Sequence, residues 1–266
     1  MAKISKIEAQ KRQGRYNVYL DGHYAFPVAE SVLVKFRLMK GMELDKDQAR
    51  EIVTADQQAQ AYAKILDYLS YQMRSESEVR RKLSDLETPE EFVAPVMAKL
   101  RERHLVDDQQ YARAYVRTMV TTTLKGPGVI RQQLRLKKVG ENEIETALQE
   151  FPPADQLENA SKLARKLFKR YHNQPEFRRE QKVRQALMMK GYSGEVYDQI
   201  KDAVTPEADP DQEADLLAAQ AEKVWRRYRR YTGMDRERRF KQAMFRKGFD
   251  LDAVQQWLDD NQESLS

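Results

Sequence analysis

The stretch that decides the fold is residues 183–197, which read Val183-Arg-Gln-Ala-Leu187-Met-Met-Lys-Gly191-Tyr-Ser193-Gly-Glu-Val-Tyr197. Val183 and Leu187 are four residues apart, a spacing that places both side chains on one face of a helix. Gly191 suits the left-handed end of that helix, and Ser193 suits the position before the next helix. The stretch therefore predicts two helices joined by a short turn, the outline of a helix-turn-helix.

The same spacing occurs four times along the chain. The apolar residues at an anchor position and at four and fourteen residues beyond it are Val79, Leu83 and Val93; Ile130, Leu134 and Ile144; Val183, Leu187 and Tyr197; and Phe240, Met244 and Val254. Fifteen residues before the last three anchors stand Tyr115, Phe168 and Trp225, which indicate a further helix in each unit. We therefore predict a mainly α protein of elongated tandem three-helix repeats, helix-turn-helix-like, with a small N-terminal β-hairpin.

Capping patterns support this division into helices. Ser75 with Glu78, and Thr88 with Glu91, both have the capping-box spacing, the second with Pro89 at the first helical position. Asp250 stands where the N-cap of the last helix should be. We predict repeats over residues 57–106, 107–153, 154–204 and 216–262. The acidic segment 205–215 contains two prolines and is interpreted as a linker.

Residues 1–56 predict a small separate module. The stretch 15–27 alternates apolar and polar residues on both sides of Asp21-Gly22, the typical signal of a hairpin turn. Pro27 confines the second strand to an edge or a strand end. A short helix is expected from residue 28 to 38, and Asp45 to Gln48 has the capping pattern of the next helix.

Catalytic and metal-binding functions find little support in the sequence. There is no cysteine, and the three histidines lie far apart, at positions 23, 104 and 172. Asp107-Asp108 resembles an acid/base pair, but Asp107 with Gln110 is better explained as a helix cap. The stretch Gly126-Pro127-Gly128 is interpreted as a turn, not a phosphate loop. We expect no enzyme, no metal and no cofactor.

No apolar run approaches the roughly 20 residues that cross a bilayer, and the N-terminus lacks the apolar core of a secretory signal. We therefore expect a cytoplasmic protein that does not bind membranes. Because nothing in the sequence indicates an obligate dimer, we also expect a monomer.

The distribution of charge indicates an anionic partner. The formal net charge is +5, and two blocks are strongly basic: residues 162–190 hold ten Lys and Arg against two acids, and residues 223–247 hold eleven against two. In the second block Trp225, Tyr228 and Tyr231 are expected to be core residues, while the arginines between them form a cationic face. The candidate residues for binding a partner or nucleic acid are Arg80, Arg81, Lys82, Arg117, Arg131, Arg135, Lys137, Lys138, Arg165, Lys169, Arg170, Arg226, Arg227, Arg229, Arg230, Arg238 and Arg239.

Four motifs resemble those of one family. They are the hairpin Tyr16-Asn-Val-Tyr-Leu-Asp-Gly-His-Tyr-Ala-Phe26, the helix Glu78-Val-Arg-Arg-Lys-Leu83, the stretch Leu105-Val-Asp-Asp-Gln-Gln-Tyr-Ala-Arg-Ala-Tyr-Val-Arg117, and Gly126 followed by Arg131-Gln-Gln-Leu134. Together they resemble the RecX family, bacterial regulators of the RecA recombinase. The sequence departs from the family pattern at Arg74 and Ser75, which stand closer together than usual.

The resemblance implies a protein without enzymatic activity that binds in the helical groove of RecA filaments on single-stranded DNA. Such a protein lowers strand exchange, ATP hydrolysis and the co-protease cleavage of the LexA repressor, in DNA repair, recombination and the SOS response. Two other hypotheses stay open: a direct DNA- or RNA-binding repeat protein, with duplex DNA as a partner, and a scaffold whose charges only confer solubility. The acidic third helices of the second and third repeats, such as Glu141 to Glu145, argue against the first of these.

Overall fold

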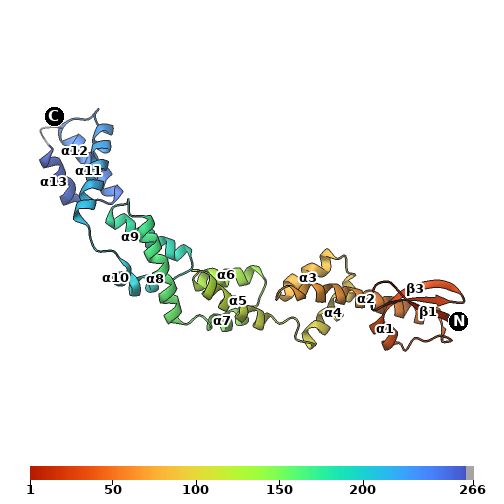
Figure 1. The fold of residues 1–266 in the computed structure, drawn as a ribbon. Coiled ribbons are helices and arrows are strands. Elements are labelled where there is room, and N and C mark those ends of the chain that lie inside the picture. Colours follow the sequence, from red (N-terminus) through yellow and green to blue (C-terminus); the bar gives the residue numbers. More distant parts are fainter. Residues whose placement is uncertain (262–266) are drawn as a thin grey trace. The chain divides into compact units, whose positions relative to one another are not determined.

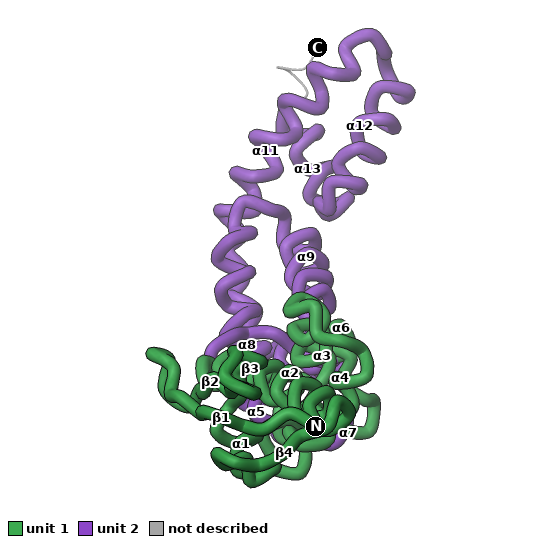
Figure 2. Tube along the Cα trace, turned by 90° about the vertical axis from the view of Figure 1, so that its right-hand side faces the viewer, with its two compact units in different colours: residues 1–112, 135–143 green, residues 113–134, 144–266 purple. Residues whose placement is uncertain are grey.

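The computed structural model describes residues 1–261 of the 266-residue chain. The chain forms two compact units (Figure 2): unit 1 comprises residues 1–112 and 135–143, and unit 2 comprises residues 113–134 and those from 144 onwards. Gln262, the last residue of the predicted fourth repeat, lies outside the described residues. The predicted fold class is confirmed, because three-helix repeats follow a small N-terminal sheet (Figure 1).

The N-terminal sheet is larger than predicted. It has four antiparallel strands, β1 (Ala2–Ala9), β2 (Arg15–Leu20), β3 (His23–Ala29) and β4 (Glu43–Leu44), in the order β3-β2-β1-β4. The β2–β3 hairpin turns at Asp21 and Gly22, whose φ angles are +50° and +87°. Pro27 lies on the edge strand β3 and is paired with Asn17 of β2. An edge strand tolerates proline, which has no N–H to donate to a neighbouring strand. The prediction of a lone hairpin was incomplete, because β1 and β4 take their partners from distant parts of the chain.

Helix α1 (Glu30–Lys35) follows the sheet and is shorter than expected, and α2 (Lys46–Ser70) begins at the predicted Asp45–Gln48 capping box. The first half of α2 contributes Ile52 to the core beneath the sheet. Its second half contributes Tyr62 and Ile65 to the core of the first repeat. The predicted boundary after residue 56 therefore falls inside one continuous helix, which the two modules share.

The repeats are built from short helices. The first repeat combines the end of α2 with α3 (Glu76–Asp85) and α4 (Glu90–Glu102), and the second contains α5 (Asp108–Thr122), α6 (Pro127–Leu136) and α7 (Glu141–Leu148). The third contains α8 (Pro153–Arg170), α9 (Glu176–Met189) and α10 (Gly194–Val204). The fourth contains α11 (Pro210–Arg227), α12 (Gly233–Lys247) and α13 (Leu251–Asp260).

The structure explains the periodic sequence pattern. All four anchors and all four residues at +4 are fully buried, which makes them the centre of each repeat core. The residue at +8 has a positive φ in every repeat, and its N–H donates to the carbonyl at +5 over 2.8–2.9 Å; these residues are Glu87, Lys138, Gly191 and Gly248. The second helix of each repeat thus ends in the same left-handed turn, which Gly adopts with the least strain.

Successive repeats contact each other through this turn. Within unit 1, the Ser75 hydroxyl at the start of α3 donates to the Lys137 carbonyl over 3.1 Å. Within unit 2, the N–H of Gly126 donates to the Lys190 carbonyl over 2.6 Å, and the N–H of Gly128 to the Gly191 carbonyl over 3.0 Å. Also within unit 2, the Arg178 guanidinium donates to the carbonyl of Arg246. In the first three repeats, the N-terminal end of the second helix therefore binds a carbonyl at the end of the second helix of the following repeat, through side-chain donors of Ser75 and Arg178 and through the backbone donors of Gly126 and Gly128.

Three local predictions need correction. The capping box at Thr88–Glu91 was wrong: α4 starts after Pro89, and no side chain caps it. The linker prediction 205–215 was wrong in its second half, because Asp209 caps Gln212 and acidic residues favour the helix start, so α11 begins at Pro210. Gly126-Pro127-Gly128 is not a free turn, since α6 starts at Pro127.

Candidate partner-binding surface

A cationic groove lies on unit 1, with a volume of about 440 Å³. Its lining residues come from α3, from the start of α5 and from the turn before α7: Glu76, Ser77, Arg80, Arg81, Asp108 and Lys138. Three of the predicted binding residues, Arg80, Arg81 and Lys138, are thus brought together although Lys138 is far from the arginines in sequence. All three are exposed, and none forms a salt bridge within residues 1–261.

The carboxylates of this groove are held by the fold. Glu76 accepts a hydrogen bond from Nε of Arg101 at 2.6 Å, and this interaction lowers the pKa of the Glu76 carboxyl. Asp108 accepts the backbone N–H of Glu76 at 2.8 Å, and burial raises the pKa of its carboxyl. Asp107 caps α5 through the N–H of Gln110 at 3.0 Å, as predicted. Both aspartates therefore have structural roles, and the arginines and Lys138 dominate the open side of the groove.

A second network behind the groove fastens the segment 135–143 to the first repeat. Lys137 Nζ donates to Glu78 at 2.7 Å and lies 5.6 Å from the centre of the Tyr111 ring. Burial opposes the charge on Glu78, but the hydrogen bonds from Lys137 and Ser75 outweigh this and lower the pKa of the carboxyl. Lys137 was predicted to bind a partner; the structure places it in an internal ion pair.

Other predicted binding residues of the second repeat are also engaged within the fold. The Arg131 guanidinium makes a bidentate contact with Glu145 at 2.8 and 3.1 Å, and Arg135 makes one with Glu141 at 2.6 and 2.8 Å. Arg117 lies 3.4 Å from Glu150. An external anion would have to compete with these carboxylates. Lys82 lies with its Nζ 5.7 Å from the centre of the Tyr68 ring.

The cations of unit 2 are mostly exposed. Arg165, Lys169 and Arg170 lie on the solvent side of α8, while its buried face carries Leu163, Leu167 and Phe168. At the end of α11, Arg227, Arg229 and Arg230 are exposed. Arg226 is exposed as well, and its guanidinium lies 3.1 Å from the carboxylate of Glu222. Positive charge at the C-terminal end of a helix is favoured by the helix dipole.

The prediction that the aromatic residues of 223–247 belong to the core is only partly correct. Trp225 is buried against Phe240, with ring centres 5.3 Å apart, whereas Tyr228 and Tyr231 are half-buried. Arg239 lies 4.2 Å from the centre of the Tyr231 ring and, like Arg238, pairs with Asp235 at 3.0 Å. These contacts offset part of the repulsion among the arginines.

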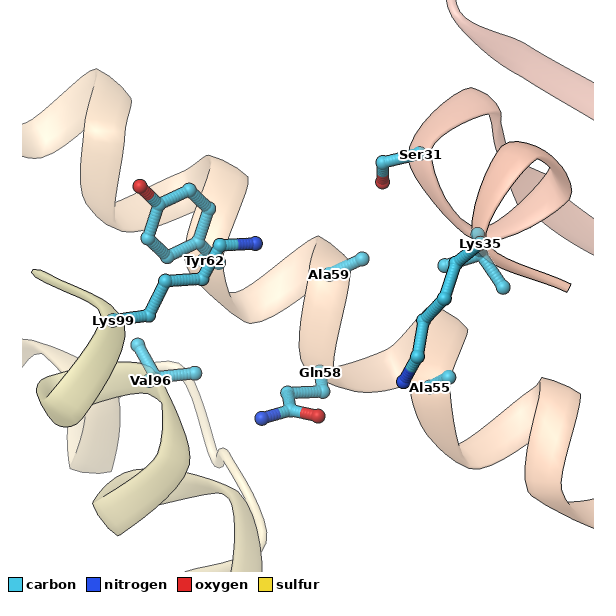
Figure 3. Close-up of a pocket in the computed structure, with 9 residues that line it drawn as sticks. Ser31, Lys35, Ala55, Gln58, Ala59, Tyr62, Val96 and Lys99 are labelled. Carbon is cyan, nitrogen blue, oxygen red and sulfur yellow. The ribbon is translucent and has the colours of Figure 1, made fainter. Parts of the chain in front are cut away.

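Sequence reasoning missed a further cationic groove on unit 1, of about 300 Å³ (Figure 3). Lys35 of α1 ends beside Ala55 of α2, and Lys99 of α4 lies beside Tyr62, with the small residue Ala59 of α2 between the two lysines. Lys99 Nζ lies 4.4 Å from the centre of the Tyr62 ring. No spacing in the sequence connects these two lysines, because they belong to different modules that only the shared helix α2 brings together.

Residues 1–261 contain no cluster of three or more His, Asp or Glu side chains that could hold a metal ion. Over the same residues, every helix is too short or too polar to cross a membrane.

Tandem three-helix repeats with cationic surfaces and a small N-terminal sheet define a helical-repeat protein. Four family models cover most of the chain: the RecX N-terminal domain (residues 2–45), the first three-helix domain (61–100), the second (107–148), and the third, which matches twice (154–203 and 211–258). The chain belongs to the RecX family of regulatory proteins.

Individual relatives agree with this assignment. The chain is 66% identical to "Regulatory protein RecX" of Limosilactobacillus reuteri over 259 residues, 97% of this chain and 98% of the relative. It is 38% identical to that of Bacillus subtilis over 260 residues, 97% and 98% of the two chains. A crystal structure of regulatory protein RecX, 65% identical, matches with a TM-score of 0.71 over 76% of this chain and 100% of the other. That of RecX from Lactobacillus salivarius, 37% identical, matches with a TM-score of 0.54 over 56% and 97%.

Proposed function

We propose that this protein binds RecA filaments on single-stranded DNA and lowers their recombinase, ATPase and co-protease activities, in DNA repair, recombination and the SOS response. The observation that carries the proposal is the cationic groove of Arg80, Arg81 and Lys138 on a chain of the RecX family. In this proposal the protein acts as a cytoplasmic monomer without catalytic activity, cofactor or membrane contact.

The groove is suited to bind anionic groups of such a filament. Two guanidinium groups and an ammonium group converge on one hollow, and none of them is held by a salt bridge within the described residues. Arginine binds phosphate and carboxylate groups through paired N–H donors, which favours directional contacts. The exposed Arg227, Arg229 and Arg230 at the end of α11 provide a second cationic site on unit 2. Several weak sites on one chain add up to useful affinity when the partner presents matching groups.

The test is ATP hydrolysis by a pre-formed RecA filament on single-stranded DNA, with this protein added well below stoichiometry. We expect a progressive fall in hydrolysis. The triple charge reversal Arg80→Glu, Arg81→Glu and Lys138→Glu should weaken the inhibition by about tenfold or more, as the loss of two to three charge-assisted contacts implies.

The matched control is Lys11→Glu, Arg12→Glu and Lys40→Glu, which changes the net charge equally at exposed positions outside the groove. If control and groove variants lose inhibition equally, overall charge is responsible and the groove has no special role. If the wild-type protein leaves hydrolysis unchanged at every ratio but binds naked DNA tightly, direct nucleic-acid binding becomes the better proposal.

A further inference from the structure

Exposed apolar residues recur at two adjacent positions of the repeat. In the second, third and fourth repeats, the residues at +5 or +6 from the anchor include a large apolar side chain that is mostly exposed: Leu136 (74%), Met188 (55%), Met189 (69%) and Phe245 (61%). The first repeat has Ser84 and Asp85 at these two positions. Each apolar residue lies in the last turn of its second helix, directly before the left-handed turn.

These side chains have no role in the repeat cores. The core face of each second helix is formed by the anchor and the residue at +4, and residues one and two positions further point away from it. Single exposed apolar residues are ordinary on protein surfaces. Their recurrence in the same helical turn is different, because the hydrogen bond from +8 to +5 gives this turn the same backbone geometry in every repeat.

The surroundings indicate the chemistry of the partner. Exposed cations follow each apolar residue: Lys138 in the second repeat, Lys190 in the third, and Arg246 and Lys247 in the fourth. This combination complements an apolar pocket with an acidic rim. Only Phe245 has a ring on which a nucleobase could stack; Leu136, Met188 and Met189 have none, so a protein surface fits the shared feature better than a single strand of nucleic acid.

We propose that the exposed apolar ends of α6, α9 and α12 each dock into an apolar, acid-rimmed pocket on a protein partner that presents this pocket repeatedly. The inference rests on the proposed function, and it assigns these contacts to the protein subunits of the filament rather than to its DNA. One such contact in each of three successive repeats matches a partner built from identical subunits.

The test compares the wild-type protein with the triple variant Leu136→Ser, Met189→Ser and Phe245→Ser. Binding to RecA filaments is measured by co-sedimentation, binding to naked single-stranded DNA by fluorescence anisotropy, and helix content by circular dichroism. Burying one large apolar side chain is worth about tenfold or more in affinity, so we expect filament binding at least a hundredfold weaker for the triple variant. DNA binding and helix content should stay unchanged.

The control variant Met39→Ser, Met73→Ser and Met234→Ser removes three exposed methionines elsewhere and should bind filaments like the wild type. Filament binding by the triple variant at wild-type strength would overturn the docking contacts while leaving the proposed function intact. An equal loss of DNA binding would overturn the assignment to a protein surface. If the wild-type protein does not bind filaments, the proposed function fails and the docking inference fails with it.

Discussion

Replacing Gly191 by Ala should strongly destabilise the contact between the second and third repeats. Gly191 has a φ of +91°, and an added Cβ would come closer than 3.0 Å to the backbone nitrogen of Val129. The left-handed conformation costs a non-Gly residue about 1–2 kcal/mol. Separating the backbones also breaks the two hydrogen bonds from Gly126 and Gly128, at about 1 kcal/mol each, and leaves the buried N–H of Gly126 unpaired. The sum is about 3–5 kcal/mol of local stability.

Two other glycines provide graded controls. Gly248 has a similar φ of +97°, but its Cβ would come closer than 3.0 Å to a side-chain atom, Cγ of Arg178, and not to backbone; Gly248→Ala should therefore cost about 1–2 kcal/mol for the left-handed backbone, in addition to a shift of the Arg178 side chain. Gly233 has a φ of +53° and open space around it, so Gly233→Ala should cost about 1 kcal/mol.

Amide hydrogen exchange measured by mass spectrometry suits a chain of several modules, because it reports local rather than global opening. In Gly191→Ala, amides of α6 and α9 should exchange about a hundred- to a thousandfold faster than in the wild type. If they exchange no faster than in Gly248→Ala, the backbone contact between the repeats does not stabilise them and our reasoning is refuted.

Three further predictions concern unit 1. Asp56→Ala should lower the free energy of unfolding in urea by about 3–5 kcal/mol, because the nearly buried guanidinium of Arg15 then has no carboxylate partner. The double variant Arg15→Met with Asp56→Leu should recover part of that stability. If it recovers none, the ion pair does not explain the loss. Lys138→Gly should raise the free energy of unfolding by about 1 kcal/mol, because Lys138 has a φ of +57°, which glycine adopts with less strain. The same change should weaken filament binding, because it removes one cation of the groove. A loss of stability would show that the Lys138 side chain contributes to the fold. The Arg101 contact lowers the folded-state pKa of Glu76 below its ordinary value of 4.5, so the stabilisation from this contact is present above pH 4.5 and is lost as the pH falls through the lowered pKa. Glu76→Gln should therefore reduce the dependence of the unfolding free energy in urea on pH in the acidic range. If that pH dependence is unchanged, other carboxylates cause it.

The two networks of unit 1 explain why the motif 105–117 has its particular residues. Val106 is buried in the first repeat core, Asp107 caps α5, and Asp108 accepts the first N–H of α3. The motif that resembles a catalytic pair in sequence therefore joins two repeats. Glu76 and Asp108 of this junction also line the cationic groove, so the same contacts help to position its arginines and Lys138.

The sequence predicted that the site consists of arginines and lysines, but it did not predict which of them line the groove. Arg80, Arg81 and Lys138 were among the predicted binding residues, and so were Arg131, Arg135 and Lys137, which pair with carboxylates in the fold. Local sequence could not show that Lys137 is paired, because Glu78 lies 59 residues from it. Arg131 and Arg135 pair with glutamates of the next helix, and the turn between the two helices decides which side chains meet. The groove of Lys35 and Lys99 left no pattern in the sequence at all.

The sequence by itself determined the repeat, its anchors, the hairpin turn and most helix caps, because these depend on side-chain spacing and on φ preferences within a few residues. Only the tertiary structure decided which repeats contact through Gly126 and Gly191, that α2 serves two modules, and that β1 and β4 complete the sheet. It also decided which cations face solvent. The physical reason is that backbone approach, strand pairing and ion pairing join residues far apart in the chain, where no local periodicity records the partner.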